Sequence, residues 1–182
     1  MDKLYLCYTS ISGSSCTIVE KVSKMLLEHN VILINMKESE PEVIARGSNF
    51  IFCAPTYGDG ELDRYTRSFL EQCNERMWQG KHVYLIGLGD QVLHGSTFAG
   101  CLWHLENYFL RRKAILNGRW PATGYKFKAS CALGVNNDFP GLVIDEVNQS
   151  NLTSSRLTTW LINIGLISKE DCNKITVKTA SE

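Results

Sequence analysis

Short apolar runs alternate with amphipathic segments along most of this chain, and that alternation limits the folds it can adopt. The runs have the length of buried strands and lie at residues 4–8, 31–34, 50–53, 83–86 and 142–144, with residues 114–116 as a possible earlier part of the last strand. The segments between them place apolar residues on one helical face: Ile18, Val22, Met25 and Leu26; Tyr65, Phe69 and Cys73; Phe98, Leu102, Leu105 and Phe109; Leu157, Trp160, Leu161 and Ile164. Apolar strands joined by helices predict a doubly wound α/β fold, with a parallel sheet covered on both faces.

The chain is expected to form a single domain over residues 1–182, because it contains no internal repeat, low-complexity tract or linker. One connection, at about 117–141, is long for a compact domain, and its aromatic residues argue against disorder. This insertion is either an ordered excursion with its own small core or a dedicated binding element. Residues 165–182 extend past the last predicted helix, and we assign them no function.

Charge and cysteine content exclude several classes of function. The chain has 19 basic and 19 acidic residues and a formal net charge of zero, which gives no indication of nucleic acid or an acidic membrane surface as a partner. Its apolar runs are too short to span a bilayer. The cysteines are odd in number, seven in all, and show neither a C-x-x-C pair nor metal-ligand spacing. They therefore indicate free thiols in a reducing cytoplasm.

Three loops follow the first, third and fourth predicted strands, where open α/β sheets bind their ligands. The first, at residues 9–15, is rich in serine and precedes a helix, so it is either an anion-binding loop or a serine-rich N-cap. The second presents Tyr57 on a turn that Gly58 and Gly60 make possible. The third presents His94 among glycines. The predicted position of His94 opposite Tyr57 favours two rings that face a flat ligand.

These loops resemble those of the flavodoxins, small electron carriers that hold FMN non-covalently. Ser-Ile-Ser-Gly-Ser-Ser at 10–15 is similar to their phosphate loop, and residues 55–62 and 87–91 are similar to their two flavin loops. The resemblance continues through Trp120-Pro121, Gly124-Tyr125 and residues 141–150, and it covers nearly all of residues 1–164. The insertion resembles the extra loop of the long-chain flavodoxins, placed in the last strand. Flavodoxins are an established example of the five-stranded order 2-1-3-4-5, so this order is implied by the resemblance.

The resemblance also implies an FMN site. Tyr57 would stack on the flavin ring, residues 10–15 would hold the phosphate, and the backbone of residues 88–90 would contact the pyrimidine edge of the ring. The implied cofactor-binding residues are Ser10, Ile11, Ser12, Gly13, Ser14, Ser15, Pro55, Thr56, Tyr57, Gly58, Asp59, Gly60, Leu88, Gly89, Asp90, His94, Thr97, Phe98 and Ala99. The resemblance implies neither catalytic residues nor metal ligands.

The function implied by the resemblance is electron transfer without a substrate of its own. The protein would be a low-potential one-electron carrier that moves between the semiquinone and hydroquinone states of FMN. Its partners would be redox proteins, such as a ferredoxin/flavodoxin–NADP reductase and an acceptor or donor complex, and it would act as a cytoplasmic monomer. The alternative is a flavodoxin-like NAD(P)H:quinone reductase. Such an enzyme needs room for a second substrate over the flavin, which stacking by both Tyr57 and His94 would close.

Three features depart from the family pattern. His94 stands where many flavodoxins carry a second stacking tyrosine, and Val147 replaces an acidic residue that is common in the family. The chain is neutral, whereas flavodoxins are typically strongly acidic. Local steering of basic partners is nevertheless expected from carboxylates near the site, namely Asp59, Glu61, Asp63 and Asp90.

Overall fold

The structure is a computed structural model that describes residues 3–9 and 13–170. Its main sheet contains β1 (Leu4–Tyr8), β2 (Val31–Asn35), β3 (Asn49–Tyr57), β4 (Glu61–Leu62), β5 (His82–Leu88), β6 (Ile115–Asn117) and β9 (Leu142–Ile144). The helices are α1 (Ser14–Met25), α2 (Arg64–Gln72), α3 (Cys101–Arg111) and α4 (Ser150–Asn163), with 3-10 turns η1 (Pro41–Arg46) and η2 (Glu75–Trp78). A small antiparallel pair, β7 (Trp120–Pro121) and β8 (Asp138–Phe139), stands apart from the main sheet.

The strand order confirms the predicted doubly wound topology. The order is β2-β1-β3-β5-β6, and all of these pairings are parallel. The fifth strand of the prediction is divided into two pieces that lie along the same edge of β5. β6 pairs with its first residues, from His82, and β9 pairs with its last residues, from Ile86 to Leu88. β4 is antiparallel to the end of β3 and forms a short hairpin with it.

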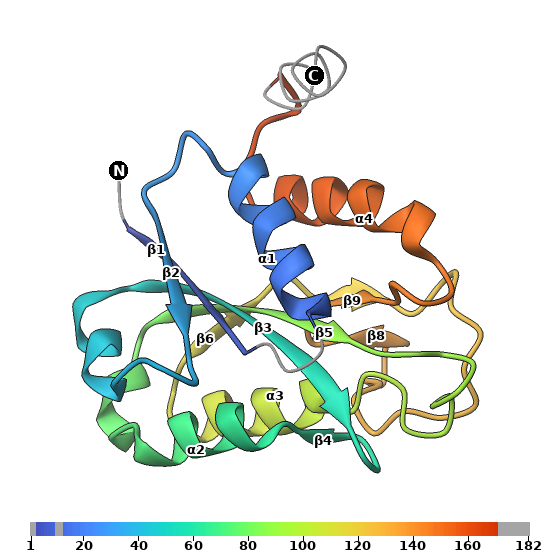
Figure 1. The fold of residues 1–182 in the computed structure, drawn as a ribbon, viewed down its shortest axis with the longest axis horizontal. Helices are drawn as coiled ribbons and strands as arrows, with labels where there is room; N and C mark the ends of the chain where they lie inside the picture. Colours follow the sequence, from blue (N-terminus) through green and yellow to red (C-terminus); the bar gives the residue numbers. More distant parts are fainter. Residues whose placement is uncertain (1–2, 10–12, 171–182) are drawn as a thin grey trace.

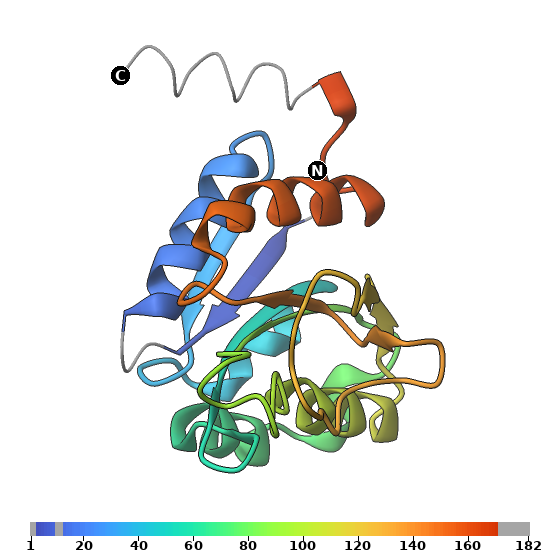
Figure 2. The ribbon, with the colours of Figure 1, turned by 90° about the vertical axis from the view of Figure 1, so that its right-hand side faces the viewer.

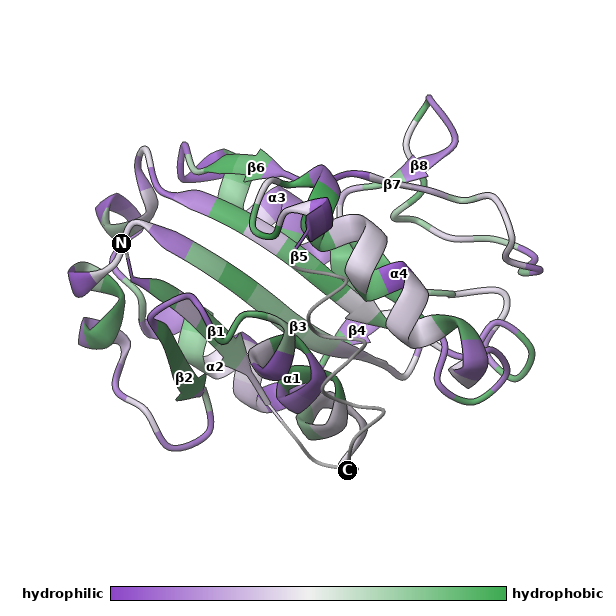
Figure 3. Cartoon of the chain, turned by 90° about the horizontal axis from the view of Figure 1, so that it is seen from above, coloured by the Kyte–Doolittle hydropathy of each residue, from purple (hydrophilic) through white to green (hydrophobic). Residues whose placement is uncertain are grey.

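Two layers of helices cover the sheet, as Figure 1 and Figure 2 show: α1 and α4 lie over one face, and α2 and α3 lie over the other. Alternate residues of each central strand enter the two cores. On β3, Phe50 and Phe52 face α2 and α3, whereas Ile51 and Cys53 face α1 and α4. Figure 3 shows the resulting apolar colour along β3 and its neighbours. This double burial explains why the strands are continuously apolar in sequence.

Residues 118–141 form an ordered excursion whose aromatic side chains pack against the rest of the domain. The ring of Phe127 stacks on that of Phe98 with a centroid distance of 5.1 Å, and Phe139 packs against both rings. The Tyr125 hydroxyl donates a hydrogen bond to Val143 O in β9. On the outer side, Arg119 pairs with the carboxylates of Glu106 and Asp138. The excursion therefore shares its core with the main domain body instead of having one of its own.

One helix begins later than its apolar spacing predicts. The spacing places Phe98 on the same helix as Leu102, but α3 begins at Cys101. Residues 97–100 form turns instead, and Ala99 has a φ of 52°. A positive φ at a residue with a Cβ is incompatible with a right-handed helix, so the helix cannot extend back through Ala99.

The six cysteines in the described ranges are free thiols; Cys172 lies outside these ranges. Four of them, Cys7, Cys53, Cys73 and Cys101, are buried in the two cores. Burial raises the pKa of Cys73 and of Cys101 to about 12, which leaves these thiols protonated near neutrality. They act as small apolar side chains in the core.

Gly141 offers a test of how closely β9 is fitted against β5. A Cβ on Gly141 would lie 2.5 Å from Leu85 Cβ and would also collide with the Leu85 carbonyl oxygen. Because a backbone atom cannot move away cheaply, we expect Gly141→Ala to lower the free energy of unfolding by about 3 kcal/mol. Gly165→Ala is the control: it has open space around it and a φ of 73°, so it should cost only about 1 kcal/mol. Urea unfolding of both variants measures the difference, and equal losses would contradict this packing.

Candidate functional site

A cavity of about 300 Å³ lies at the carboxyl ends of the parallel strands. It is lined by residues from four segments of the chain: Ser14 from the start of α1; Pro55, Thr56, Tyr57 and Gly58 from the end of β3; Leu88, Gly89, Asp90 and His94 from the end of β5 and the following loop; and Ile144, Glu146 and Val147 from β9 and the following loop. Nine of these residues are among those implied by the sequence. The parallel pairing brings them together because it places the ends of β3, β5 and β9 at one edge.

The hairpin between β3 and β4 presents Tyr57 to the cavity. Tyr57 pairs with Glu61, and the turn between them is closed by a hydrogen bond from Gly60 N to Tyr57 O at 3.1 Å. Gly58 and Gly60 have φ values of 47° and 95°, which residues with a Cβ rarely adopt. Tyr57 is half-buried, and Asp59 is exposed at the tip of the turn. The two glycines thus allow the sharp reversal that the sequence predicts.

The same turn rests on the start of α3 through a contact that sequence reasoning missed. A Cβ on Gly100 would lie 2.5 Å from Gly60 O and 2.7 Å from Gly60 Cα. Only a residue without a side chain lets the two backbones approach this closely. Gly100 therefore helps to position the turn that carries Tyr57, although it does not line the cavity.

Asp63 holds the end of β1 beside the start of α2. Its side chain is 3 % exposed, and it accepts hydrogen bonds from the hydroxyls of Thr9, at 2.8 Å, and Thr66, at 2.5 Å. It also accepts from the backbone N–H groups of Tyr65 and Thr66, as the N-cap of α2. Asp63 was expected to help steer basic partners as one of the carboxylates near the site, but its side chain is buried and hydrogen-bonded within this network.

The loop after β5 forms the opposite wall of the cavity. Gly89 N donates to Ile144 O at 3.1 Å, which joins the start of the loop to β9. Asp90 Oδ1 accepts hydrogen bonds from the backbone of Val92 and Leu93. Although slight burial raises the pKa of Asp90, the hydrogen bonds to its charged form outweigh this effect, and the pKa lies below its ordinary value. His94 is exposed and lines the cavity.

The start of α1 forms one end of the cavity. Ser14 is exposed and lines it, whereas Ser15 is buried in the first turn of the helix. Gly13 is the N-cap, with a φ of 87°. The N–H groups of a first helical turn provide a site for an anion. The predicted site residues Ser10, Ile11 and Ser12 lie outside the described residues.

Some predicted site residues do not line the cavity. Phe98 and Ala99 are fully buried, and the Phe98 ring packs among the aromatic residues of the excursion. Thr97 is half-buried and lies close to Gly60 behind the turn. Conversely, Ile144, Glu146 and Val147 line the cavity but were not among the implied site residues. The sequence feature that could have identified them is their position: Ile144 ends the last strand of the sheet, and Glu146 and Val147 follow it closely.

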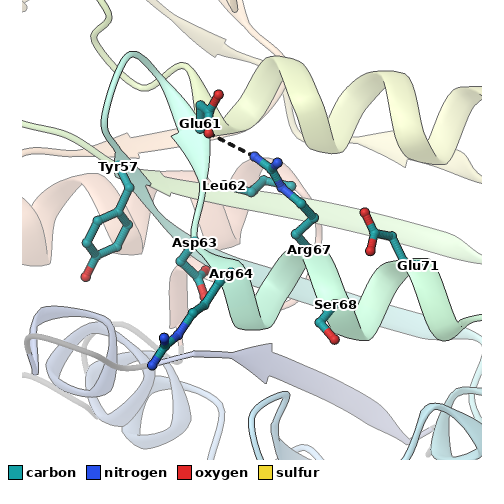
Figure 4. A pocket seen from close by; sticks show the side chains of 8 residues that line it. All are labelled: Tyr57, Glu61, Leu62, Asp63, Arg64, Arg67, Ser68 and Glu71. Atoms are coloured by element: carbon teal, nitrogen blue, oxygen red, sulfur yellow. Dashed lines mark hydrogen bonds and ion pairs between the residues drawn. The ribbon is translucent and has the colours of Figure 1, made fainter.

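A second cavity, of about 420 Å³, shares Tyr57 with the first (Figure 4). Its other residues come from β4, the following residue and the outer face of α2: Glu61, Leu62, Asp63, Arg64, Arg67, Ser68 and Glu71. An ion pair joins Glu61 and Arg67 at 3.0 Å, which Figure 4 marks with a dashed line. This cavity is the larger of the two, but it lies along a helix with charged side chains. The smaller one lies at the carboxyl ends of the strands and is therefore the candidate site.

Neither a metal centre nor a membrane span was found in the parts of the chain that the structure describes. No group of three or more His, Cys, Asp or Glu side chains within these parts could hold a metal ion. The described helices are all too short or too polar to cross a membrane.

Known proteins with similar sequences are flavodoxins, although no family model matches the chain. The flavodoxin of Helicobacter pylori is 33 % identical over 161 residues, which cover 88 % of this chain and 95 % of that protein. Flavodoxin 1 of Azotobacter vinelandii is also 33 % identical, over 88 % of this chain and 94 % of that protein. A flavodoxin of Enterobacter agglomerans is 41 % identical, but the match spans only 59 % of this chain and 65 % of that protein.

Solved structures agree with this result. The flavodoxin of Fusobacterium nucleatum, which was crystallised with flavin mononucleotide, matches with a TM-score of 0.84 at 28 % identity. The match covers 90 % of this chain and 97 % of that structure. Sequence similarity over nearly the whole length of several relatives, together with the same strand order, shows that this chain belongs to the flavodoxin family.

Proposed function

We propose that the protein binds FMN in the 300 Å³ cavity and uses it to carry single electrons between redox proteins. The observation that carries this proposal is the convergence of nine residues implied by the sequence on one cavity at the carboxyl ends of the strands. The flavodoxin relatives support the same function. FMN would supply the one-electron chemistry, and the protein would bind it, orient it and control its exposure to water.

The residues of the cavity suit a flavin nucleotide. A volume of about 300 Å³ falls at the lower end of the range of small-molecule sites. The backbone at Gly58 and Gly89 borders the cavity without side chains that would keep a flat ring away. Tyr57 supplies an aromatic face. At Ser14, a hydroxyl and the start of α1 provide donors for a phosphate.

We assign roles to these residues on that basis. Tyr57 would stack on one face of the flavin ring and His94 would lie towards the other, while the backbone of residues 88–90 would contact the pyrimidine edge. The phosphate would lie at the start of α1, with residues 10–12 completing its loop as the resemblance implies. Thr97, Phe98 and Ala99 would not contact the cofactor. They would support the loops that do.

The finer features of the function are also proposals. The carrier would work at low potential, between the two more reduced states of FMN, and would have no substrate of its own. It would be a single-domain cytoplasmic monomer that exchanges electrons with a ferredoxin/flavodoxin–NADP reductase and with an acceptor or donor complex. The family relationship supports a carrier over a quinone reductase, since the relatives are flavodoxins.

The proposal is tested by purifying the protein and identifying any bound flavin from its absorption spectrum and by chromatography. Apoprotein should bind FMN in a 1:1 complex and quench its fluorescence. NADPH alone should leave the complex oxidised, and addition of a ferredoxin/flavodoxin–NADP reductase should reduce it. Direct and rapid reduction by NAD(P)H, with turnover of a quinone, would show an enzyme instead of a carrier.

Tyr57 should contribute strongly to flavin affinity. Aromatic stacking on a base contributes about 1–3 kcal/mol, so Tyr57→Ala should raise the Kd for FMN about tenfold to a hundredfold. Tyr65→Ala is the matched control, because Tyr65 is also half-buried but lies on α2 and does not line the cavity. Fluorescence titration of the two apoproteins measures the effect. If Tyr57→Ala and Tyr65→Ala weaken FMN equally, Tyr57 is not a stacking residue.

The phosphate end should distinguish FMN from riboflavin. A hydrogen bond to a charged group contributes about 1.5–3 kcal/mol. We therefore expect Ser14→Ala to weaken FMN binding about tenfold or more while it leaves riboflavin binding unchanged. Ser154→Ala, at an exposed serine of α4, should change neither affinity. An equal loss for FMN and riboflavin in Ser14→Ala would show that the phosphate lies elsewhere.

A further inference from the structure

The loop between β5 and α3 forms one wall of the candidate cavity, although it has no regular secondary structure where it does so. Gly89, Asp90 and His94 of this loop all line the cavity, so the position of the loop determines the width of the cavity. Two of the hydrogen bonds that hold the loop involve the segment after β9, residues 145–149, for which the sequence predicted no cofactor contact.

Asp145 is the first residue of that segment, and its side chain is fully buried. Its Oδ2 accepts a hydrogen bond from Gln91 N in the opposite loop at 3.0 Å, and its Oδ1 accepts one from Asn148 N at 2.9 Å. None of the ion pairs found in the described ranges includes Asp145. A buried carboxylate needs strong compensation, and here N–H donors provide it.

Asn148 extends this arrangement into the loop. Its Nδ2 donates to both carboxylate oxygens of Asp145, at 3.0 Å each, and to Asp90 Oδ1, at 2.8 Å. Asp90 Oδ1 in turn accepts from the backbone N–H groups of Val92 and Leu93. One amide group thus joins a buried carboxylate after β9 to a carboxylate that organises the turn after β5.

The same arrangement connects two walls of the cavity. Glu146 and Val147 line it from the loop after β9 and Asp90 lines it from the loop after β5, and Asn148 bonds across these two neighbouring loops. Without the Nδ2 donor, the carboxylates of Asp90 and Asp145 would face each other with no shared hydrogen-bond donor. Like charges repel, and the loop would also lose the hydrogen bond that joins Asp90 to the segment after β9. The loop would then move away from the segment after β9, and the cavity would widen.

We propose that Asp145 and Asn148 are positioning residues, a clamp that holds the 89–95 loop against a flavin in the cavity and so sets both the affinity for the flavin ring and its reduction potential. This inference rests on the proposed function. The clamp acts through Asp90 and the loop backbone and needs no contact of its own with the flavin.

Asn148→Ala removes the Nδ2 donor but keeps the backbone N–H that Asp145 accepts. Because the loop borders the ring and not the phosphate, the Kd values for FMN and riboflavin should rise by the same factor, about tenfold, which corresponds to about 1.4 kcal/mol. Asn151→Ala, at an exposed asparagine in the first turn of α4, is the matched control and should bind both flavins as the wild type does. An unchanged Kd for both flavins in Asn148→Ala would overturn the proposal.

The reduction potential provides a readout that a purely structural role would not move. With the shared donor removed, two carboxylates near the ring are less well compensated, so added negative charge on the flavin is less favourable. Spectroelectrochemical titration of Asn148→Ala should therefore give a more negative midpoint potential. If the substitution raises the Kd of the reduced flavin tenfold more than the Kd of the oxidised flavin, the potential of a one-electron couple falls by about 59 mV. Asn148→Gln retains the amide and should recover part of the change. Lower stability with wild-type affinity and potential would overturn the proposal.

A double-mutant cycle tests whether Asp90 and Asn148 act together. Asp90→Ala removes the other end of the Asn148 contact, so the double variant should weaken flavin binding by less than the product of the two single effects. Independent, multiplicative effects would show that Asp90 and Asn148 do not act together. Failure of the wild-type protein to bind any flavin would instead remove the proposed function, and this inference with it.

Discussion

The parallel pairing of β3 with both of its neighbours is the constraint on which the rest of the structure depends. β3 pairs with β1 on one side and with β5 on the other, along most of its length. The strands are therefore buried on both faces and end at the same edge, where the loops after them meet. Every residue that lines the candidate cavity lies at the end of one of the strands or in the segment that follows one. The cavity is thus a consequence of the sheet and not of any single loop.

Much of this arrangement could be predicted from the sequence because it depends on local pattern. Runs such as residues 50–53 alternate between two cores, which requires apolar side chains at every position. Tyr57 at the end of β3, followed by Gly58 and Gly60, likewise specifies a displayed ring at a sharp turn. These features are set by neighbouring residues, and the resemblance to flavodoxins adds the identity of the loops.

The parts that could not be predicted depend on contacts between distant residues. Asp63 was counted among the carboxylates that would steer a partner, but Thr9, more than fifty residues earlier, makes it part of a buried network. Nothing near Gly100 in the sequence indicates that its Cα must accommodate the backbone of Gly60. The link between Asp90 and Asn148 joins loops that follow different strands. Such pairs become visible only once the strand order places the loops side by side.

The chain as a whole has no net charge, and several carboxylates near the site have hydrogen-bond or ion-pair partners within the protein. Asp90 and Asp145 accept hydrogen bonds from N–H donors, Glu61 pairs with Arg67, and Glu146 lies 3.5 Å from Lys21. The two ion pairs therefore leave less free negative charge around the cavity than its acidic residues suggest, whereas the hydrogen bonds to Asp90 and Asp145 leave those charges in place. Long-range attraction of a basic partner weakens accordingly, and short-range fit gains importance.

We propose that the flavin binds at the carboxyl ends of the strands and not in the larger cavity along α2. NMR titration of ¹⁵N-labelled apoprotein with FMN tests this most directly, because both cavities are lined by residues with backbone amides. We expect large shifts for Gly58, Gly89 and Asp90 and small shifts for Ser68 and Glu71. Large shifts confined to residues 64–71, with Gly89 and Asp90 unmoved, would contradict it.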